Sequence, residues 1–212
     1  MGKAVNWVFG LVALIALGAG VFLQQYKPAP TPPRSALVYP VPKQLAPFQL
    51  TDQNGQVFDQ QRLKGKWSLL FAGYTFCPDI CPTTLLQLKR AHQQVGLQDQ
   101  LQVVLVSVDP KRDTQQKLKQ YMDYFNPEFV AVRGEHPQLY PLTQQLGLVY
   151  AMNGDDPEDY QVDHSAAVAL INPQGQLVAL LKPKDFKPGE LAMVKADDVA
   201  HDVGVLIEAA SL

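Results

Sequence analysis

A continuous apolar run from Trp67 to Tyr74 leads directly into Cys77 and Cys81, the only two cysteines of the chain. A run that is continuous rather than alternating is typical of a central strand buried on both faces. Pro82 suits the first turn of a helix, so a helix is expected directly after the cysteines. Open α/β sheets present their ligand crevices at the carboxyl ends of their strands. The sequence therefore predicts two sulfurs at the end of a central strand.

The globular segment, which starts near Leu45, alternates predicted strands with predicted helices. Asn54 and Gly55 supply the positive φ angles of a tight turn and predict a hairpin of residues 48–51 and 56–58. Strands are expected at 101–108, 129–132, 166–171 and 177–181, and helices at 113–124, 138–146 and 188–210. In the helix after the cysteines, the buried face is expected to hold Leu85, Leu86, Leu88 and Ala91. This alternation predicts an α/β fold, a mixed sheet covered by helices on both faces.

Residues 1–26 are expected to form a membrane anchor. The stretch from Val5 to Leu23 carries no charge and has about the 20 residues that a helix needs to cross a bilayer. Lys3 precedes it, which favours an amino terminus in the cytoplasm. A cleaved signal peptide is the alternative, because small residues that could host a processing site occur at Ala16, Gly18 and Gly20.

Residues 27–44 are expected to be a semi-extended tether, because prolines stiffen a backbone and remove amide donors. They lie at Pro28, Pro30, Pro32, Pro33, Pro40 and Pro42. The tether would hold a single globular domain, residues 45–212, away from the bilayer. A chain of 212 residues has room for one such domain and an appendage.

The charge of the chain argues against nucleic acid as a partner. The formal net charge is −2, and no long run of Lys or Arg occurs. Proteins that bind a phosphate backbone carry a basic patch or stripe, which this chain lacks.

The spacing of Cys77 and Cys81 suits chemistry at a shared site. Side chains at i and i+4 of a helical turn share a face, so both sulfurs can converge on one atom. The amino terminus of the following helix adds amide donors and a partial positive charge, which favour thiolate over thiol. A thiolate is the better nucleophile and the better ligand for soft metals.

A third ligand is expected from a histidine, and His164 is the best placed of the four in the chain. It stands directly before the predicted strand at 166–171, at a loop-to-strand junction from which it can reach the sheet edge. For His92, His136 and His201 the expectation is a solvated surface residue.

Two thiolates and an imidazole suit copper. Soft sulfur holds Cu(I), and the same set can accept a water or oxygen ligand for Cu(II). Zinc also accepts these ligands and stays an alternative. A plain disulfide between Cys77 and Cys81 is a further alternative in an oxidising compartment, although so small a loop would stabilise little.

Three motifs together closely resemble the Sco (SenC) family, the synthesis-of-cytochrome-oxidase proteins. They are Gly73-Tyr74-Thr75-Phe76-Cys77-Pro78-Asp79-Ile80-Cys81-Pro82, Ser107-Val108-Asp109-Pro110-Lys111-Arg112-Asp113-Thr114 and Tyr160-Gln161-Val162-Asp163-His164-Ser165. They occur in family order, and the resemblance runs from about residue 45 to the end of the chain. A single amino-terminal span is also typical of the family.

This resemblance implies a thioredoxin-like fold with one amino-terminal transmembrane helix, anchored in the bacterial inner membrane and facing the periplasm. It implies copper bound by Cys77, Cys81 and His164. The implied partner is subunit II of cytochrome c oxidase, whose dinuclear CuA centre family members help to load. They do so by passing copper, by keeping the target cysteines reduced, or both. The copper donor is not identified by the resemblance.

Four acidic residues of the motifs have open roles. Asp79 could cap the helix or tune the thiolates, while Asp109 and Asp113 suit a turn and a cap but could also support the site. Asp163 could orient His164, although adjacent residues of a strand point to opposite faces.

The favoured hypothesis is a copper delivery protein rather than an enzyme in the turnover sense. The alternative is a thiol-disulfide oxidoreductase or peroxidase that uses the same cysteines. Enzymes of that kind usually separate their cysteines by two residues, whereas three intervene here. A redox or copper sensor is a third hypothesis.

Overall fold

The computed structural model describes residues 7, 14–18, 20, 31–97, 99–154, 160–187 and 189–211. The chain divides into a first unit, Met1–Pro32, and a second unit, Pro33–Leu212. Most of the expected span, residues 5–23, lies outside the described residues, and those of it that are described are helical. Within the described part of the chain, no helix is both long and apolar enough to cross a membrane. The anchor and its cleavage therefore stay predictions.

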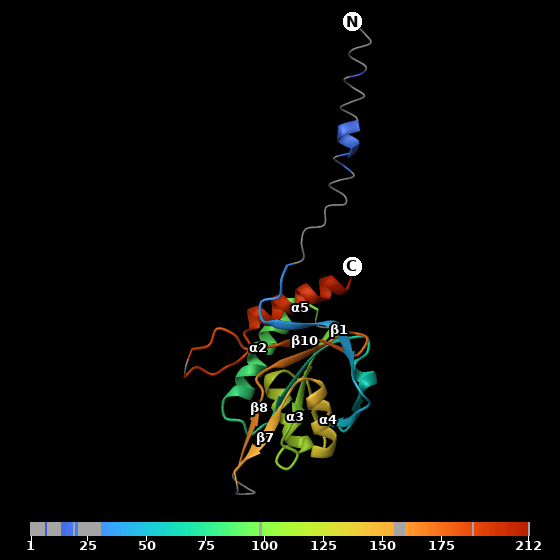
Figure 1. Cartoon of the computed structure of the whole chain (residues 1–212). Helices are drawn as coiled ribbons and strands as arrows, with labels where there is room; N and C mark the ends of the chain where they lie inside the picture. Colours follow the sequence, from blue (N-terminus) through green and yellow to red (C-terminus); the bar gives the residue numbers. More distant parts are fainter. Residues whose placement is uncertain are drawn as a thin grey trace. The chain divides into compact units, whose positions relative to one another are not determined.

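The second unit is built on an eight-stranded mixed sheet with the order β1-β10-β9-β4-β5-β6-β2-β3. In Figure 1, β1 lies beside β10 at one edge of this sheet. Its strands are β1 (Ala36–Gln44), β2 (Gln49–Asp52), β3 (Val57–Asp59), β4 (Trp67–Gly73), β5 (Leu101–Ser107), β6 (Val130–Arg133), β9 (Val168–Ile171) and β10 (Gln176–Leu181). The helices are η1 (Gln60–Leu63), α2 (Ile80–Val95), α3 (Gln115–Phe125), α4 (His136–Gln145) and α5 (Ala196–Ala210).

Strand β4 is central, parallel to β5 and antiparallel to β9. Successive side chains of a strand point to opposite faces. Leu69 and Phe71 accordingly pack with residues of α2, α3 and α5 on one face, while Leu70 and Ala72 pack with η1 and α4 on the other. All seven residues of β4 are buried. The prediction of a central strand and of a mixed sheet covered on both faces is thus confirmed.

A separate two-stranded ribbon, β7 (Tyr150–Asn153) and β8 (Gln161–His164), lies outside the main sheet. The two strands are antiparallel, and Tyr150 pairs with His164. Tyr150 and Val162 pack into the core cluster on the α4 face. No strand was expected in this part of the sequence, because its short, polar stretches lack a clear periodicity.

Strand β1 begins inside the expected tether. It pairs with β10 at the sheet edge, with a register irregularity between Val38 and Lys43. Pro40 and Pro42 fall within that irregularity, and prolines are tolerated at edge strands and bulges because no ladder hydrogen bond is lost there. Part of the 27–44 segment is therefore sheet rather than free linker.

Two helix expectations need correction. Helix α5 begins at Ala196, not near residue 188, so the segment before it is irregular. Leu86, expected on the buried face of α2, is 46% exposed, while Leu85 and Leu88 are fully buried. An amphipathic helix buries a stripe, and the side chain of Leu86 lies beyond the edge of that stripe.

Candidate metal centre

The two cysteines lie where β4 passes into α2. Cys77 is half-buried in the connecting loop, and Cys81, the second residue of α2, is fully buried. Both are free thiols, and the amide of Cys81 donates to the sulfur of Cys77 over 3.4 Å. A Cβ atom added to Gly73 would lie 3.0 Å from the sulfur of Cys81 and 2.9 Å from Leu105 Cδ1. Glycine at the end of β4 therefore makes room for the buried sulfur.

His164, the last residue of β8, meets this pair. Its Nε2 atom lies 3.1 Å from the sulfur of Cys81. The ligand atoms of Cys77, Cys81 and His164 all lie within 4.8 Å of one another, and no other His, Cys, Asp or Glu group in the described residues forms such a cluster. The structure thus brings together the three residues that the sequence predicted.

The backbone orients the imidazole. Nδ1 of His164 lies 3.2 Å from the carbonyl oxygen of Ser165, and a carbonyl can only accept. A proton on Nδ1 would satisfy this contact, and with a metal ion at the sulfurs the lone pair of Nε2 would then be free to bind it. The ring of Tyr74 meets the imidazole edge-on, with centroids 6.0 Å apart.

The two sulfurs differ in acidity because they share one site. A hydrogen bond from the thiol of Cys81 lowers the pKa of Cys77 well below its usual value, and contacts from His164 and backbone amides act in the same direction. The same interaction with Cys77, together with burial, raises the pKa of Cys81. Cys77 is therefore the more acidic of the two thiols, and Cys81 is the less acidic.

The donor set fits a soft or borderline metal ion. One thiolate, one thiol that can ionise on binding and one imidazole are the ligands that Cu(I) and zinc accept. Cys77 and His164 are only half-buried, so the site also has an open side for an exchangeable ligand or an incoming partner. The three ligand atoms lie close enough together to hold one metal ion.

Asp113 secures the loop that carries the cysteines. Its buried carboxylate accepts from the hydroxyl of Thr75 at 2.5 Å, from the amide of Thr75 at 3.2 Å and from the hydroxyl of Ser107 at 2.6 Å. Burial raises the pKa of Asp113. The cap of α3 is Thr114, whose side chain accepts from the amide of Lys117. Asp113 thus supports the site rather than capping the helix.

Asp109 and two residues without a predicted role, Arg112 and Tyr160, form a second network. Asp109 is fully buried and accepts from the Tyr160 hydroxyl at 2.5 Å and from Arg112 Nε at 2.5 Å. Both residues stand within the three sequence motifs, which is the only signal that could have identified them. Their connection across the fold is not visible in the sequence.

The remaining acidic candidates lie apart from the imidazole. Asp79 occupies the cap position of α2, but its side chain makes no capping hydrogen bond. The carboxylate of Asp163 accepts from the side-chain amide of Asn153 across the ribbon, on the face opposite to that of His164. The expectation that Asp163 points away is borne out by this pairing.

The other histidines are less solvated than expected. His92 is only 4% exposed, with Nε2 2.8 Å from the carbonyl oxygen of Leu101. His136 and His201 are half-buried, beside the Tyr150 hydroxyl and the Asp202 carboxylate respectively. The surface interpretation of His92 is therefore wrong, because a backbone carbonyl satisfies its ring inside the core.

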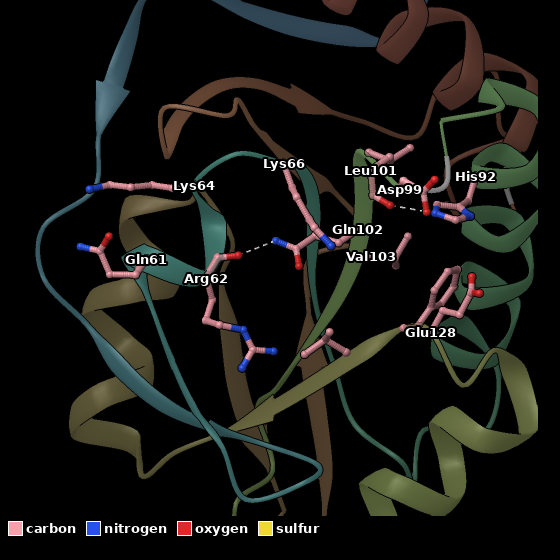
Figure 2. A pocket seen from close by; sticks show the side chains of 12 residues that line it. Gln61, Arg62, Lys64, Lys66, His92, Asp99, Leu101, Gln102, Val103 and Glu128 are labelled. Carbon is pink, nitrogen blue, oxygen red and sulfur yellow. Dashed lines mark hydrogen bonds between the residues drawn. The ribbon is translucent and has the colours of Figure 1, made fainter.

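A cavity of about 490 Å³ lies elsewhere, at the amino ends of β5 and β6 (Figure 2). It is lined by Gln61, Arg62, Lys64, Lys66, His92, Asp99, Leu101, Gln102, Val103, Glu128, Phe129 and Val130. Figure 2 shows the hydrogen bond from the Gln102 side-chain amide to the backbone carbonyl of Arg62, two of the residues that line the cavity. Neither cysteine lines it, and the metal centre lies at the opposite, carboxyl ends of the strands.

Known proteins resemble this chain in sequence. A Stutzerimonas stutzeri protein is 41% identical over 145 residues, covering 68% of this chain and 71% of that protein. A SCO2-like protein of Rickettsia typhi is 38% identical over 135 residues, covering 62% of this chain and 66% of that protein. The chain thus spans about two thirds of the length of each.

The solved structures agree. The crystal structure of Arabidopsis thaliana ScoI with copper bound superposes with a TM-score of 0.66 at 28% identity, covering 77% of this chain and 98% of that one. The thioredoxin-like architecture is confirmed by this likeness. The family model SCO1/SenC matches residues 40–197. Because this match covers most of the chain, the protein belongs to the SCO1/SenC family.

Proposed function

We propose that this chain is a copper-binding protein that assists the assembly of cytochrome c oxidase, with Cys77, Cys81 and His164 as its copper ligands. The observation that carries the proposal is the convergence of two sulfurs and one ring nitrogen within 4.8 Å. Support also comes from the family relationship and from the copper bound in the Arabidopsis thaliana relative.

The roles of the three residues follow from their environments. Cys77, the more acidic of the two thiols, would offer the first sulfur to an incoming ion, and Cys81 would have to lose its proton for its sulfur to bind as well. His164 adds a nitrogen from a separate ribbon. Two soft sulfurs retain Cu(I), and the half-buried edge of the site leaves a path for a partner to take the ion.

The finer proposal concerns the partner and the location. The chain would be held in the bacterial inner membrane by residues 1–26, with its sheet domain in the periplasm, and would serve the CuA centre on oxidase subunit II. The apolar sequence of residues 5–23 and the family resemblance support this assignment.

Copper analysis tests the ligand assignment. The full-length protein, reduced and in detergent, should bind one copper ion with sulfur coordination. His164→Ala should weaken binding by more than the roughly 10–100-fold typical of losing an outer partner of a metal ligand. His201→Gln is the matched control, because His201 lies beside Asp202 in α5, away from the sulfurs. Unchanged copper affinity in His164→Ala would remove that residue from the site.

A second function, thiol-disulfide exchange, is favoured by the unequal sulfurs. The half-buried Cys77 thiolate could attack a disulfide of the target protein and form a mixed disulfide. Cys81 would then attack Cys77, release the target as a dithiol and leave this chain oxidised, to be regenerated by an external thiol. Reduction of subunit II cysteines that persists in His164→Ala would support this function over copper delivery.

A further inference from the structure

His164 approaches the sulfurs from a ribbon that shares no backbone ladder with the main sheet. Strand β8 pairs with β7, and these two strands form a sheet of their own. The cysteines, by contrast, follow β4 at the centre of the eight-stranded sheet. Apart from the short link of residues 165–167 that joins His164 to β9, side-chain contacts set the distance between the imidazole and the sulfurs.

The strongest such contacts converge on Tyr160, directly before β8. Tyr160 is 7% exposed, and its hydroxyl donates to Asp109. Its carbonyl oxygen accepts from Arg112 Nη1 at 2.9 Å, and the guanidinium lies over its ring, 3.7 Å from the centroid. One residue, four positions before His164, is thus held through its hydroxyl, its backbone and its ring.

Arg112 also touches the segment that carries the cysteines. Its guanidinium carbon lies 5.1 Å from the ring centroid of Phe76, the neighbour of Cys77, and 5.7 Å from that of Tyr74. Its Nε donates to the buried carboxylate of Asp109, and its side chain is only 15% exposed. A single planar group therefore contacts both segments that supply metal ligands.

We propose that Arg112, held by Asp109 and Tyr160, is a positioning residue that places His164 against the two sulfurs. The guanidinium has a rigid fork of donors, and hydrogen bonds between charged groups in a buried setting are strong and directional. It therefore fixes the start of β8 in distance and orientation, where a lysine would supply charge without the fork. The inference rests on the proposed copper site and assigns the residues that shape it.

The alternative is that Arg112 stabilises the fold in general. The ribbon has a second attachment to the domain, which allows the positioning role and the stabilising role to be distinguished. On β7, the hydroxyl of Tyr150 lies 2.8 Å from His136 Nδ1, and its ring stacks on Tyr140 with centroids 4.7 Å apart. This attachment is independent of Arg112. Loss of the Arg112 contacts should therefore misplace His164 without detaching the ribbon.

Arg112→Lys in the full-length protein is the first test. We expect thiolate-to-Cu(II) charge transfer to persist, nitrogen hyperfine coupling in the Cu(II) EPR spectrum to weaken, and copper affinity to fall about 10–100-fold. Arg62→Lys is the matched control. Arg62 also pairs with an aspartate, Asp52, and lies over an aromatic ring, that of Phe58, but it is remote from the sulfurs. Its lysine variant should match wild type in both readouts.

A double-mutant cycle separates positioning from stabilisation. If Arg112 acts through the imidazole, Arg112→Lys should cause no further loss of copper affinity in a His164→Ala background. An equal loss of affinity in both backgrounds, or wild-type affinity and EPR spectrum in Arg112→Lys alone, overturns the proposal. Should the lysine variant fail to fold, Tyr160→Phe, which removes only one hydroxyl, takes its place in the same cycle.

A metal-free readout distinguishes failure of this inference from failure of the proposed function. In the apo protein, NMR contacts between the His164 and Tyr74 rings should weaken in Arg112→Lys and stay unchanged in Arg62→Lys. If wild type binds no copper through its cysteines, the proposed function fails while this measurement still decides whether Arg112 positions the ring. Unchanged ring contacts in Arg112→Lys count against the positioning role whatever the copper result.

Discussion

Nε2 of His164 lies 3.1 Å from the sulfur of Cys81, although 83 positions separate the two residues in the chain. The packing of α2 and of the β7–β8 ribbon brings the ligand atoms of Cys77, Cys81 and His164 within 4.8 Å of one another. A preorganised site loses less conformational entropy on binding than one that must assemble around the ion. Substitutions of the residues that pack against these elements should therefore alter the distances between the ligand atoms.

Gly73→Ala should disturb the buried sulfur. The added Cβ would lie 2.9 Å from Leu105 Cδ1, a distance that real Cβ contacts essentially never show, and 3.0 Å from Cys81 Sγ, which is tighter than nine in ten real Cβ contacts. We expect a loss of about 1–3 kcal/mol in the free energy of unfolding, typical of overpacking, together with weaker copper binding. Urea denaturation and copper titration measure the two effects.

Gly204→Ala is the control for this substitution. Nothing lies within 4 Å of a Cβ at Gly204, which stands inside α5, so alanine there should be neutral or stabilising. If Gly73→Ala matches Gly204→Ala in stability and copper binding, the close approach of residue 73 to the Cys81 sulfur affects neither property.

Thr75→Val should loosen the cysteine loop. Valine keeps the shape of threonine but removes the hydroxyl that donates to Asp113 at 2.5 Å. The buried carboxylate would lose one of its donors, which typically costs about 1–3 kcal/mol. Hydrogen exchange of the amides of residues 74–77 and 79 should become faster. Thr114→Val, which removes the side-chain cap of α3, should leave that exchange unchanged.

Cys77 should react with iodoacetamide much faster than Cys81 in the metal-free protein. The hydrogen bond from Cys81 lowers the pKa of Cys77, so its thiolate persists below the usual thiol range. Its alkylation rate should stay nearly flat from about pH 8 down to about pH 6, where an ordinary thiol loses reactivity with each unit. Mass spectrometry of quenched samples measures both rates.

Cys81→Ser supplies the matching variant. A serine hydroxyl replaces the thiol donor, so the pKa of Cys77 should change and its rate profile should shift on the pH axis. An unaltered profile in Cys81→Ser, or a steep fall of the wild-type rate below pH 8, would contradict the proposal that a hydrogen bond from the Cys81 thiol lowers the pKa of Cys77.

Asp202→Asn should destabilise the domain in a pH-dependent way. The carboxylate accepts from the amides of Arg34, Ser35 and Ala36 and from the hydroxyl of Ser35, at 2.6–2.8 Å. Burial opposes ionisation of this group, but these donors and His201 outweigh it and hold the pKa of Asp202 below its ordinary value.

The sign of the pH effect follows from that depressed pKa. The folded state binds a proton on Asp202 less readily than the unfolded state, so the stabilisation is complete above the unfolded pKa of about 4 and is lost as the pH falls through the folded value. Wild type should exceed Asp202→Asn by about 1–3 kcal/mol at pH 7, and the gap should narrow below about pH 4. Urea unfolding at several pH values measures the gap, and a difference that does not depend on pH would refute the assignment.

Local patterns predicted the parts of the site that are local in the chain. The apolar run of β4, the paired sulfurs and the helix after them are neighbours in sequence, so their periodicity and spacing could be interpreted directly. The edge strand β1 was missed because its prolines suggested a tether, and its place in the sheet depends on pairing with β10, more than a hundred residues away. His92 was misjudged for a similar reason, since its burial depends on the carbonyl of Leu101.

The sequence alone therefore determined the mixed α/β sheet, the family resemblance and the three candidate ligand residues. Only the tertiary structure decided how they meet: that His164 stands on a separate ribbon, that Asp113 holds the cysteine loop, and that Arg112 joins Tyr160 to Phe76. Hydrophobic periodicity reports which face of an element is buried. It carries no information about which distant side chains will share a hydrogen bond, because that depends on how the whole chain packs.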